Sequence, residues 1–323
     1  MSRNQDKKVA VIGSGLIGRS WAMLFAGAGY RVSLYDINHA QLQHALKDIE
    51  MQLKELKEKD LLRSDIPPAD QLKSISVTAD LAECMKDAFY VQECVWESLE
   101  AKTATFKLLD AHAQPGQILA SSTSTIPGSK FTSDLVHKTQ CIVAHPINPP
   151  FYCPLVEVVP TPWTDKGVID LCMNVMKEIG QVPVKFKKEI LGFAINRLQY
   201  ALLAECWNLI ADDVLDVDGL DKIMSEGLGC RYAFLGPMEV THLNANGVVE
   251  YVQKYNQGYL NVCRDLKPAP SWETPELLEK VRRELEAKVP LSQLEERRKY
   301  RDVRLAALAK MKRDLEKQEK SGK

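Results

Sequence analysis

Residues 8–36 read KVAVIGSGLIGRSWAMLFAGAGYRVSLYD, and this stretch decides the fold. The β-branched run 8–12 predicts a short strand that stops at Gly13. Apolar residues spaced three and four apart from about 16 to 28 predict a helix. Residues 30–35 predict a second strand, so the stretch forms a βαβ unit.

The turn after the first strand carries the motif Gly13-Ser14-Gly15-Leu16-Ile17-Gly18. In a dinucleotide-binding motif the first glycine makes the tight turn, and the second lets the backbone approach the pyrophosphate. The third allows close packing of helix on strand. The helix N-terminus then offers free N–H groups and a positive dipole end to the phosphates. We therefore expect this segment, with Leu16 and Ile17 at its helical end, to hold a cofactor.

Asp36 closes the second strand, 18 residues after Gly18. A carboxylate at this position accepts hydrogen bonds from the adenosine ribose hydroxyls and repels a 2′-phosphate. Because no Arg or Lys follows it directly, we expect NAD rather than NADP. The alternatives are a chance glycine turn and FAD. The strand, helix and acid occur together, however, and no further flavin signature is present.

Short strands and helical patterns alternate after this unit, which is typical of a parallel, doubly wound sheet. A long charged helix is expected at 40–62, and its ELKEKD segment is so polar that we expect a solvent-exposed arm. Further helices are expected at 99–113 and 168–179. The further strands are expected near 74–78, 88–95, 117–122, 141–146 and 155–160.

The pattern changes near 188–192, where we place a domain boundary. Residues 193–213 predict an amphipathic helix, and helical patterns continue to a highly charged helix at 292–323. We expect an α/β protein with an N-terminal Rossmann domain, 1–190, built on a doubly wound, mainly parallel sheet. An all-α domain for substrate binding and dimerisation, 191–323, is expected to follow.

Composition excludes several function classes. The chain has 323 residues, of which 45% are hydrophobic and 26% charged, and a formal net charge of −1. Such a charge argues against a general affinity for nucleic acid or membrane, so a small molecule is the expected partner. The N-terminus lacks a signal-peptide apolar region, and no apolar run approaches the ~20 residues of a membrane span. A cytoplasmic location is expected.

The eight cysteines are scattered and form no C-x-x-C pair. This spacing suits neither a zinc site nor a disulfide framework. We therefore expect no metal, and we interpret the cysteines that lie in apolar runs as small buried hydrophobes.

Polar side chains follow two of the predicted strands. The run 121–125, SSTST, follows the strand QILA, and His145 follows the strand CIVA. In open α/β sheets ligands bind outside the carboxyl ends of the strands, so both lie where a nicotinamide ring is expected. Pro146 biases His145 away from helical geometry, so the ring is presented from an extended segment or a turn.

Hydride transfer from an alcohol to NAD needs a base, and His is the side chain best suited to this near neutral pH. Glu157 lies in the apolar strand LVEVV, where a lone carboxylate is costly to bury. Pairing with His145 relieves that cost, orients the ring and stabilises the imidazolium. Asn196 lies early in the helix after the boundary, where its amide can bond a substrate oxygen.

Each of these residues also has a structural interpretation. His145 is alternatively a satisfied core histidine, and Ser124 is one of many serines found in turns. Glu157 is alternatively the partner of a lysine, and Asn196 a helix cap. Taken singly, these residues therefore do not decide between a catalytic and a structural role.

Four segments resemble the 3-hydroxyacyl-CoA dehydrogenase superfamily, and the resemblance covers nearly the whole chain. They are GSGLIG, SSTST, AHPINPPFYCPLVEVVP and GFAINRLQYALLAE. The resemblance implies an active site made of Ser124, His145, Glu157 and Asn196. It also implies that Glu97 and Lys102, in WESLEAK, lie near the nicotinamide end of the cofactor.

The segment SEGLGCRYAFLGPMEVTHLNA resembles the lambda-crystallin branch of this superfamily, which is similar to L-gulonate 3-dehydrogenase. Members that use CoA esters typically carry a proline-containing G-P-F-E version, whereas Arg231 and Tyr232 stand here. We hypothesise that Arg231 binds the free carboxylate of a small polyhydroxy acid, because a guanidinium does so in bidentate fashion. The alternative is that Arg231 pairs with a structural acid.

The resemblance implies oxidation of L-gulonate to 3-dehydro-L-gulonate, in the glucuronate–xylulose route. The rivals are a 3-hydroxyacyl- or 3-hydroxybutyryl-CoA dehydrogenase and a carnitine dehydrogenase. Two alternatives of another class are a structural lens protein and a module that senses NAD. The resemblance also suggests a homodimer formed through the C-terminal helices.

Overall fold

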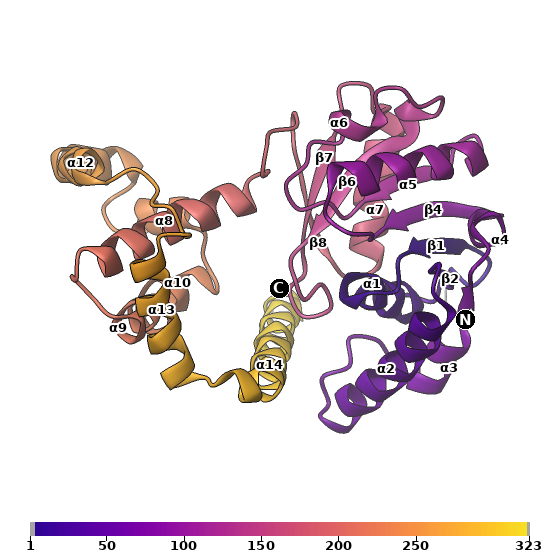
Figure 1. The fold of residues 1–323 in the computed structure, drawn as a ribbon, viewed down its shortest axis with the longest axis horizontal. Helices are drawn as coiled ribbons and strands as arrows, with labels where there is room; N and C mark the ends of the chain where they lie inside the picture. The colour runs from indigo at the N-terminus through magenta and orange to yellow at the C-terminus, as the bar shows by residue number, and fades with distance from the viewer. Residues whose placement is uncertain (1–3, 322–323) are drawn as a thin grey trace. The chain divides into compact units, whose positions relative to one another are not determined.

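The computed structural model describes residues 4–321, which divide into two compact units (Figure 1). The first unit runs to Asn196 and also takes in Asp302–Arg313. The second holds Arg197–Arg301 and the residues from Asp314. The first unit is α/β and the second is helical, so the predicted fold class is confirmed.

Within the described residues the first unit contains one sheet of eight strands, in the order β3-β2-β1-β4-β5-β6-β7-β8. Every neighbouring pair is parallel except β6 and β7, which are antiparallel. A short loop, 147–154, joins those two, whereas parallel neighbours need a longer crossover. The strands are β1 (Lys8–Ile12), β2 (Arg31–Tyr35), β3 (Ile75–Thr78), β4 (Ala88–Glu93), β5 (Ile118–Ser121), β6 (Cys141–Pro146), β7 (Leu155–Pro160) and β8 (Val182–Lys185).

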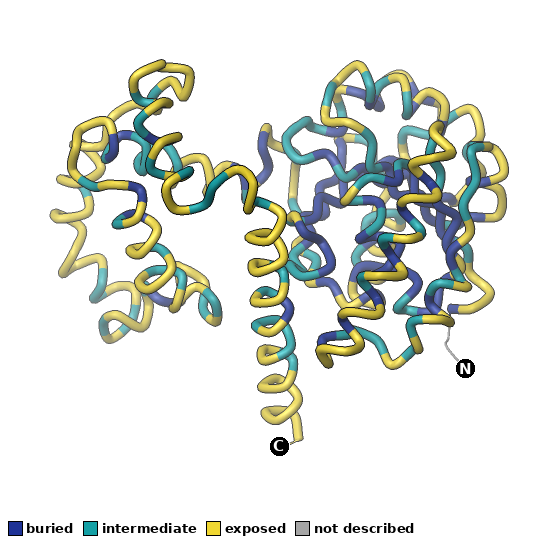
Figure 2. The backbone as a smooth tube through the Cα atoms, turned by 60° about the horizontal axis from the view of Figure 1, so that its bottom comes forward, coloured by how far each residue is buried: buried dark blue, intermediate teal, exposed yellow. Residues whose placement is uncertain are grey.

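Helices cover both faces of this sheet. They are α1 (Leu16–Gly27), α2 (His39–Glu58), α3 (Pro68–Lys73), α4 (Leu81–Met85), α5 (Leu99–His112), α6 (Ser129–Thr132) and α7 (Lys166–Glu178). Val9 and Val11 pack into one core cluster with α1, α2 and α7, while Ala10 and Ile12 pack into another with α4, α5 and α6. Alternate residues of a strand point to opposite faces, which makes the fold doubly wound. Figure 2 shows the buried residues, in dark blue, gathered in the interior of the first unit.

Helix α2 corrects one prediction, because it is not a solvent-exposed arm. Leu42, Ile49 and Leu53 are buried in the core cluster of the first unit, and Leu56, inside the ELKEKD segment, is buried as well. These residues recur at helical spacing along one face. The many charged side chains on the other faces concealed this stripe in the sequence.

Four short elements of the first unit named above were not predicted. They are α3, α4, α6 and the strand β8. β8 is the last strand of the sheet order and contains Pro183. A proline cannot donate to a strand ladder and is tolerated at a sheet edge, so its sequence does not resemble that of a central strand.

The second unit is all-helical. Ile210, Val217, Leu220 and Val281 form its buried cluster. A π-helical turn at Ile223–Leu228 precedes α10. The helices are α8 (Ile195–Ala211), whose first residues belong to the first unit, α9 (Val217–Lys222), α10 (Gly229–Tyr232), α11 (Pro237–Leu243), α12 (Val248–Asp265), α13 (Pro275–Lys288) and α14 (Leu294–Ser321).

Part of the C-terminal helix belongs to the first unit. Ala306 is buried in the core cluster of that unit, and Lys310 forms an ion pair with Asp60 at the end of α2. The compact units therefore differ from the predicted ranges 1–190 and 191–323 at residues 191–196 and at the segment Asp302–Arg313, which both belong to the first unit. Among residues 4–321, no helix has the length and apolar character needed to cross a membrane.

Candidate functional site

The turn between β1 and α1 needs glycine at its first and third positions. Gly13 has φ +103°, in the left-handed region that favours glycine. A Cβ atom on Gly13 would lie 2.9 Å from the carbonyl oxygen of Cys94, and one on Gly18 would lie 1.8 Å from that of Gly13. Both glycines are therefore required by the turn itself.

Gly15 differs, because a Cβ atom there would meet nothing within 4 Å. Gly15 is the N-cap of α1, no side chain caps that end, and no acidic residue lies in its first turn. The free N–H groups and the positive end of the helix dipole thus face an open space. This arrangement fits a pyrophosphate that lies against the backbone.

Asp36 lies directly after β2 and contacts this loop. Its Oδ2 atom accepts hydrogen bonds from the backbone N–H of Ser14, at 3.0 Å, and from the Ser14 hydroxyl, at 2.7 Å. Its Oδ1 atom accepts one from the N–H of Asn38, at 3.1 Å. A carboxylate oxygen has two acceptor sites, so Oδ1 keeps capacity for a ribose hydroxyl.

His145 and Glu157 face each other across the antiparallel pair β6 and β7. The Nδ1 atom of His145 lies 2.8 Å from Oε2 of Glu157, and both side chains are buried. No hydrogen-bond partner of the His145 Nε2 atom occurs among residues 4–321. The contact holds the ring by one nitrogen and leaves the other available. Glu157 is not paired with a lysine.

The second oxygen of Glu157 binds the start of α8. Its Oε1 atom accepts hydrogen bonds from the N–H groups of Ala194 and Ile195, each at 2.9 Å. Gly192 and Phe193, with φ of +74° and +48°, turn the chain just before these residues. The Phe193 ring is fully buried with its centroid 5.6 Å from that of His145. Glu157 therefore positions both the imidazole and the helix start.

Asn196 joins the start of α8 to the turn after β5. Its Nδ2 atom donates a hydrogen bond to the backbone oxygen of Ser124, at 2.7 Å. The hydroxyl of Ser124 has no partner among the described residues. Asn196 is the second residue of α8 rather than its cap. The Ser124 hydroxyl is therefore available to a ligand, while Asn196 fixes the main chain beneath it.

Glu97 organises the turn at 123–125. Its Oε1 atom accepts hydrogen bonds from the Thr123 hydroxyl, at 2.8 Å, and from the N–H groups of Ser124 and Thr125, at 2.7 and 3.0 Å. Burial raises the pKa of the Glu97 carboxyl, but the charge of Lys102 and these hydrogen bonds outweigh burial and hold the pKa below its usual range. Glu97 is therefore an anion at neutral pH.

Glu93 is a residue of this network that the sequence reasoning missed. The Nζ atom of Lys102 lies 3.0 and 3.2 Å from the two oxygens of Glu93 and 3.3 Å from Oε2 of Glu97. Glu93 and Lys102 are fully buried, and Ser121 also donates to Glu93. Its signal was the same as that of Glu157: a carboxylate in an apolar strand, which requires a partner.

Some of the predicted site residues are joined by direct contacts. The chain of contacts runs from His145 through Glu157 to the start of α8, and from Asn196 through Ser124 and Glu97 to Lys102. Arg231 is not part of this network. It lies exposed in α10, and no carboxylate among residues 4–321 lies within ion-pair distance.

Neither disulfide nor metal chemistry is visible among the described residues. All eight cysteines are free, and three of them, Cys84, Cys141 and Cys172, are buried. No group of three or more His, Cys, Asp or Glu side chains in the described ranges is arranged to hold a metal ion.

Two family models account for most of the chain. The NAD-binding domain of 3-hydroxyacyl-CoA dehydrogenase matches residues 8–190, and the C-terminal domain of the same enzyme matches 192–286. The chain belongs to the 3-hydroxyacyl-CoA dehydrogenase family. This member of the family is an NAD-dependent oxidoreductase, so the predicted family and cofactor are confirmed.

Relatives and solved structures agree with this assignment. The family member is 44% identical to a lambda-crystallin homologue of Homo sapiens, over 96% of this chain and 98% of the relative. It is 33% identical to a 3-hydroxyacyl-CoA dehydrogenase of Gibberella moniliformis, over 75% and 73%. The structure of 5-formyl-3-hydroxy-2-methylpyridine 4-carboxylic acid 5-dehydrogenase, an NAD+-dependent dismutase, has a TM-score of 0.79 and 26% identity. That likeness covers 94% of this chain and 98% of the other.

Two glycine substitutions separate cofactor binding from folding. Gly15→Ala places a methyl group in the open space where the pyrophosphate is expected, so NADH affinity falls by roughly tenfold or more, equal to about 1.4 kcal/mol. Its stability changes by less than about 1 kcal/mol, the scale of an N-cap change. Gly18→Ala drives its Cβ into Gly13 and loses both stability and NADH binding.

Fluorescence titration with NADH and denaturant unfolding measure the two effects. Gly167→Ala is the control, because a Cβ there meets nothing within 4 Å and the residue lies in α7. Undiminished NADH affinity in Gly15→Ala would contradict the placement of the pyrophosphate.

Proposed function

We propose that the protein oxidises the 3-hydroxyl group of a small hydroxy acid with NAD, with L-gulonate as substrate and 3-dehydro-L-gulonate as product. The observation that carries the proposal is the buried His145–Glu157 pair, with Nδ1 bound and Nε2 available. A general base needs this arrangement, since one ring nitrogen must be fixed while the other accepts a proton.

Residues of the first unit have separate roles in the proposed oxidation. The substrate hydroxyl lies between the Ser124 hydroxyl and Nε2 of His145, and Asn196 holds the Ser124 turn in place. His145 takes the hydroxyl proton at Nε2, and Glu157 stabilises the resulting imidazolium through Nδ1. When bound, NAD supplies the hydride acceptor, so the C–H electron pair and proton of carbon 3 leave as hydride and a ketone remains.

The cofactor residues are proposed on the same geometric grounds. The loop Gly13–Gly18, including Leu16 and Ile17, holds the pyrophosphate, and Asp36 holds the adenosine ribose. Glu97 faces the nicotinamide end through the turn at 123–125. Lys102 is enclosed by two carboxylates, so we assign it the role of positioning Glu97 rather than of touching NAD.

Arg231 supports a free acid as substrate. It follows a π-helical turn, Ile223–Leu228, a feature that is frequent at functional sites. No acid among residues 4–321 neutralises it, so its guanidinium is available to a carboxylate. The dehydrogenase of known structure described above is also named for a carboxylic acid. We propose that Arg231 binds the substrate carboxylate.

A CoA thioester is the second candidate substrate. The Gibberella relative and the family models bear that name. The chain contains Gly236-Pro237 at the start of α11, so a proline is present in this segment and does not argue against a CoA ester. Arg231 remains the argument for a free acid, and it also disfavours a cationic substrate such as carnitine.

We also propose a cytoplasmic homodimer that forms through the C-terminal helices. None of the α12 residues is buried, and five large apolar side chains recur at helical spacing along it. They are Val249, Val252, Tyr255, Tyr259 and Val262. Such a stripe is typical of an interaction surface. A monomer in light scattering at micromolar concentration would contradict this proposal. A structural role in lens is compatible with the same surface.

The substrate proposal is tested by two assays on one preparation. NADH forms with L-gulonate and NAD, and NADH is not consumed with acetoacetyl-CoA. His145→Gln lowers the gulonate rate by about 10²- to 10⁴-fold, the contribution of a general base, and keeps its affinity for NADH. His137→Gln is the matched control, because His137 also pairs with a carboxylate, that of Asp110. Turnover of the CoA ester alone would reject the free-acid proposal.

Arg231→Leu tests the substrate contact separately. Loss of a charge-assisted bond of about 1.5–3 kcal/mol raises KM for L-gulonate roughly 10- to 100-fold and leaves NADH affinity unchanged. Arg283→Leu removes the same charge from an exposed position of α13 and leaves KM unchanged. An unchanged KM in Arg231→Leu would remove the contact from the proposal.

A further inference from the structure

Gln92 is a fully buried polar side chain beside the residues of the site. It precedes Glu93 at the carboxyl end of β4. Alternate residues of a strand point to opposite faces of the sheet, so Glu93 faces α5 and Lys102, whereas Gln92 faces α1 and α7. A buried amide is costly unless its donors and its acceptor are bound. The partners of Gln92 therefore indicate what it does.

The hydrogen bonds of Gln92 fix the orientation of its amide. The Oε1 atom accepts a hydrogen bond from the Tyr90 hydroxyl, at 2.8 Å. The Nε2 atom donates to the Ser122 hydroxyl, at 2.7 Å, and over a longer distance, 3.4 Å, to the backbone oxygen of Ala144. A carbonyl oxygen can only accept, so the NH2 group is the end that faces Ala144. Both N–H groups of the amide are therefore used.

The Ser122 hydroxyl has no capacity left for a ligand. Its Oγ atom accepts from the amide of Gln92 and also from the indole N–H of Trp21, at 3.1 Å. Its proton is then directed to the sulfur of Cys94, at 3.3 Å. A hydroxyl has one proton and two lone pairs, and here all three are bound. Ser122 therefore has a structural role, unlike Ser124, whose hydroxyl is available to a ligand.

The two groups that Gln92 binds lie where the ladder between β5 and β6 ends. The last pair of that ladder is Ser121 and Val143, so the next residues in register are Ser122 and Ala144. Gln92 connects these two residues through its NH2 group, one step beyond the ladder. The side chain thus bridges the two chain segments near the carboxyl ends of the strands, where ligands bind in open α/β sheets.

We propose that Gln92 is a positioning residue that sets the distance between the Ser124 hydroxyl and Nε2 of His145. Ser124 lies two residues after Ser122, and His145 directly follows Ala144. The inference rests on the proposed function, in which both groups reach one substrate hydroxyl. A displacement of about 1 Å between such groups lowers a rate by up to roughly 10²-fold. Gln92 itself touches neither substrate nor cofactor.

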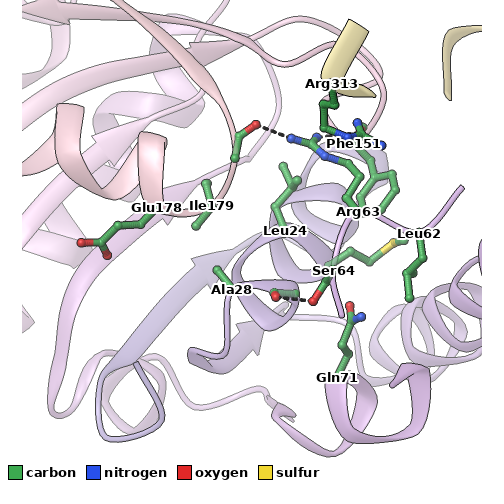
Figure 3. A pocket seen from close by; sticks show the side chains of 13 residues that line it. Leu24, Ala28, Leu62, Arg63, Ser64, Gln71, Phe151, Glu178, Ile179 and Arg313 are labelled. Carbon is green, nitrogen blue, oxygen red and sulfur yellow. Dashed lines mark hydrogen bonds between the residues drawn. The ribbon is translucent and has the colours of Figure 1, made fainter. Parts of the chain in front are cut away.

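The hairpin of β6 and β7 is fixed at other points. Glu157 binds His145 across the ladder of these two strands. Figure 3 shows Arg63 beside the ring of Phe151, in the loop that joins the strands, and the Nη1 atom of Arg63 donates to the Phe151 backbone oxygen, at 2.8 Å. These contacts hold His145 within its hairpin. They do not set the distance from the hairpin to β5, which is the distance that Gln92 spans.

The turn that presents Ser124 is bound by side chains from three directions. Glu97 binds two of its N–H groups, and Asn196 binds its Ser124 oxygen from the start of α8. Gln92 binds the foot of the turn and, with the same NH2 group, the strand that carries His145. Because Glu97 and Asn196 remain in a Gln92 variant, we expect the turn to stay formed but to shift relative to His145.

Gln92→Met tests this role. Methionine is a flexible side chain of similar length that fills the same space, but it has no N–H group to donate to Ser122 and Ala144. The rate of NADH formation at saturating substrate falls about tenfold or more, with whichever substrate the wild-type protein turns over. NADH affinity stays unchanged, because Gln92 does not contact the glycine loop. Stopped-flow absorbance and fluorescence titration measure the two quantities.

Gln117→Met is the matched control. Gln117 is also buried, its Nε2 atom donates to two backbone oxygens, and its Oε1 atom accepts from one N–H group. It lies directly before β5, at the edge of the sheet opposite the site. Its loss lowers stability as the loss of Gln92 does, but leaves the rate of NADH formation unchanged. Equal rates in the two variants would overturn the role of Gln92.

The His145→Gln background separates positioning from a general loss of structure. If Gln92 acts through the placement of His145, Gln92→Met adds no further loss of rate once His145 is replaced. A purely structural effect of Gln92→Met would lower the residual rate of His145→Gln by the same factor as it lowers the wild-type rate. That result would contradict the positioning role.

Hydrogen exchange of the backbone N–H groups of residues 122–126 tests the role without a substrate. Exchange in Gln92→Met is faster than in the wild-type protein and in Gln117→Met, because only Gln92 supports this turn. Unchanged exchange in Gln92→Met would overturn the role of Gln92. Absence of turnover of L-gulonate by the wild-type protein would reject the proposed substrate instead, so the two failures are distinguishable.

Discussion

The arrangement of this site depends on one buried carboxylate. Glu157 carries a charge into the interior of the sheet, which is costly unless its oxygens are bound. It meets that cost with three hydrogen bonds, one to Nδ1 of His145 and two to the N–H groups at the start of α8. The same group therefore aims the imidazole and fixes the place where the second unit's first helix begins. The carboxylate of Glu157 thus positions both the catalytic ring and the backbone at the start of α8.

A second network of carboxylates lies on the neighbouring strands, and its charges are likewise bound by polar partners. Glu93 and Lys102 are fully buried and neutralise each other, and Lys102 also forms an ion pair with Glu97. Glu97 then binds three groups of the turn that presents Ser124. The parallel strands β4, β5 and β6 end at one edge of the sheet, and β7, which is antiparallel to β6, begins there. The two networks therefore meet at the edge where open α/β sheets bind ligands. Asn196 joins them through the Ser124 main chain.

Much of the fold could be predicted from the sequence, because β-branched runs that end at turn residues and a glycine-rich turn define the Rossmann domain. The carboxylate in the strand 155–160 also predicted a partner, since a carboxylate among apolar residues must be hydrogen-bonded or paired with a charge. Other features could not be predicted. Lys102 lies nine residues from Glu93, and only the packing of α5 on β4 reveals their contact. The apolar stripe of α2 was hidden by its charged faces, and β8 by Pro183.

The most direct test of the account is the single-turnover rate of Glu157→Gln. Glutamine has one acceptor oxygen, so it cannot bind both His145 and the N–H groups of α8 as the carboxylate does. With whichever substrate the wild-type protein turns over, the account predicts a rate of NADH formation at least about 10²-fold lower, with NADH affinity unchanged. A rate close to that of the wild type would show that the His145–Glu157 pair is not the base, and would contradict the account.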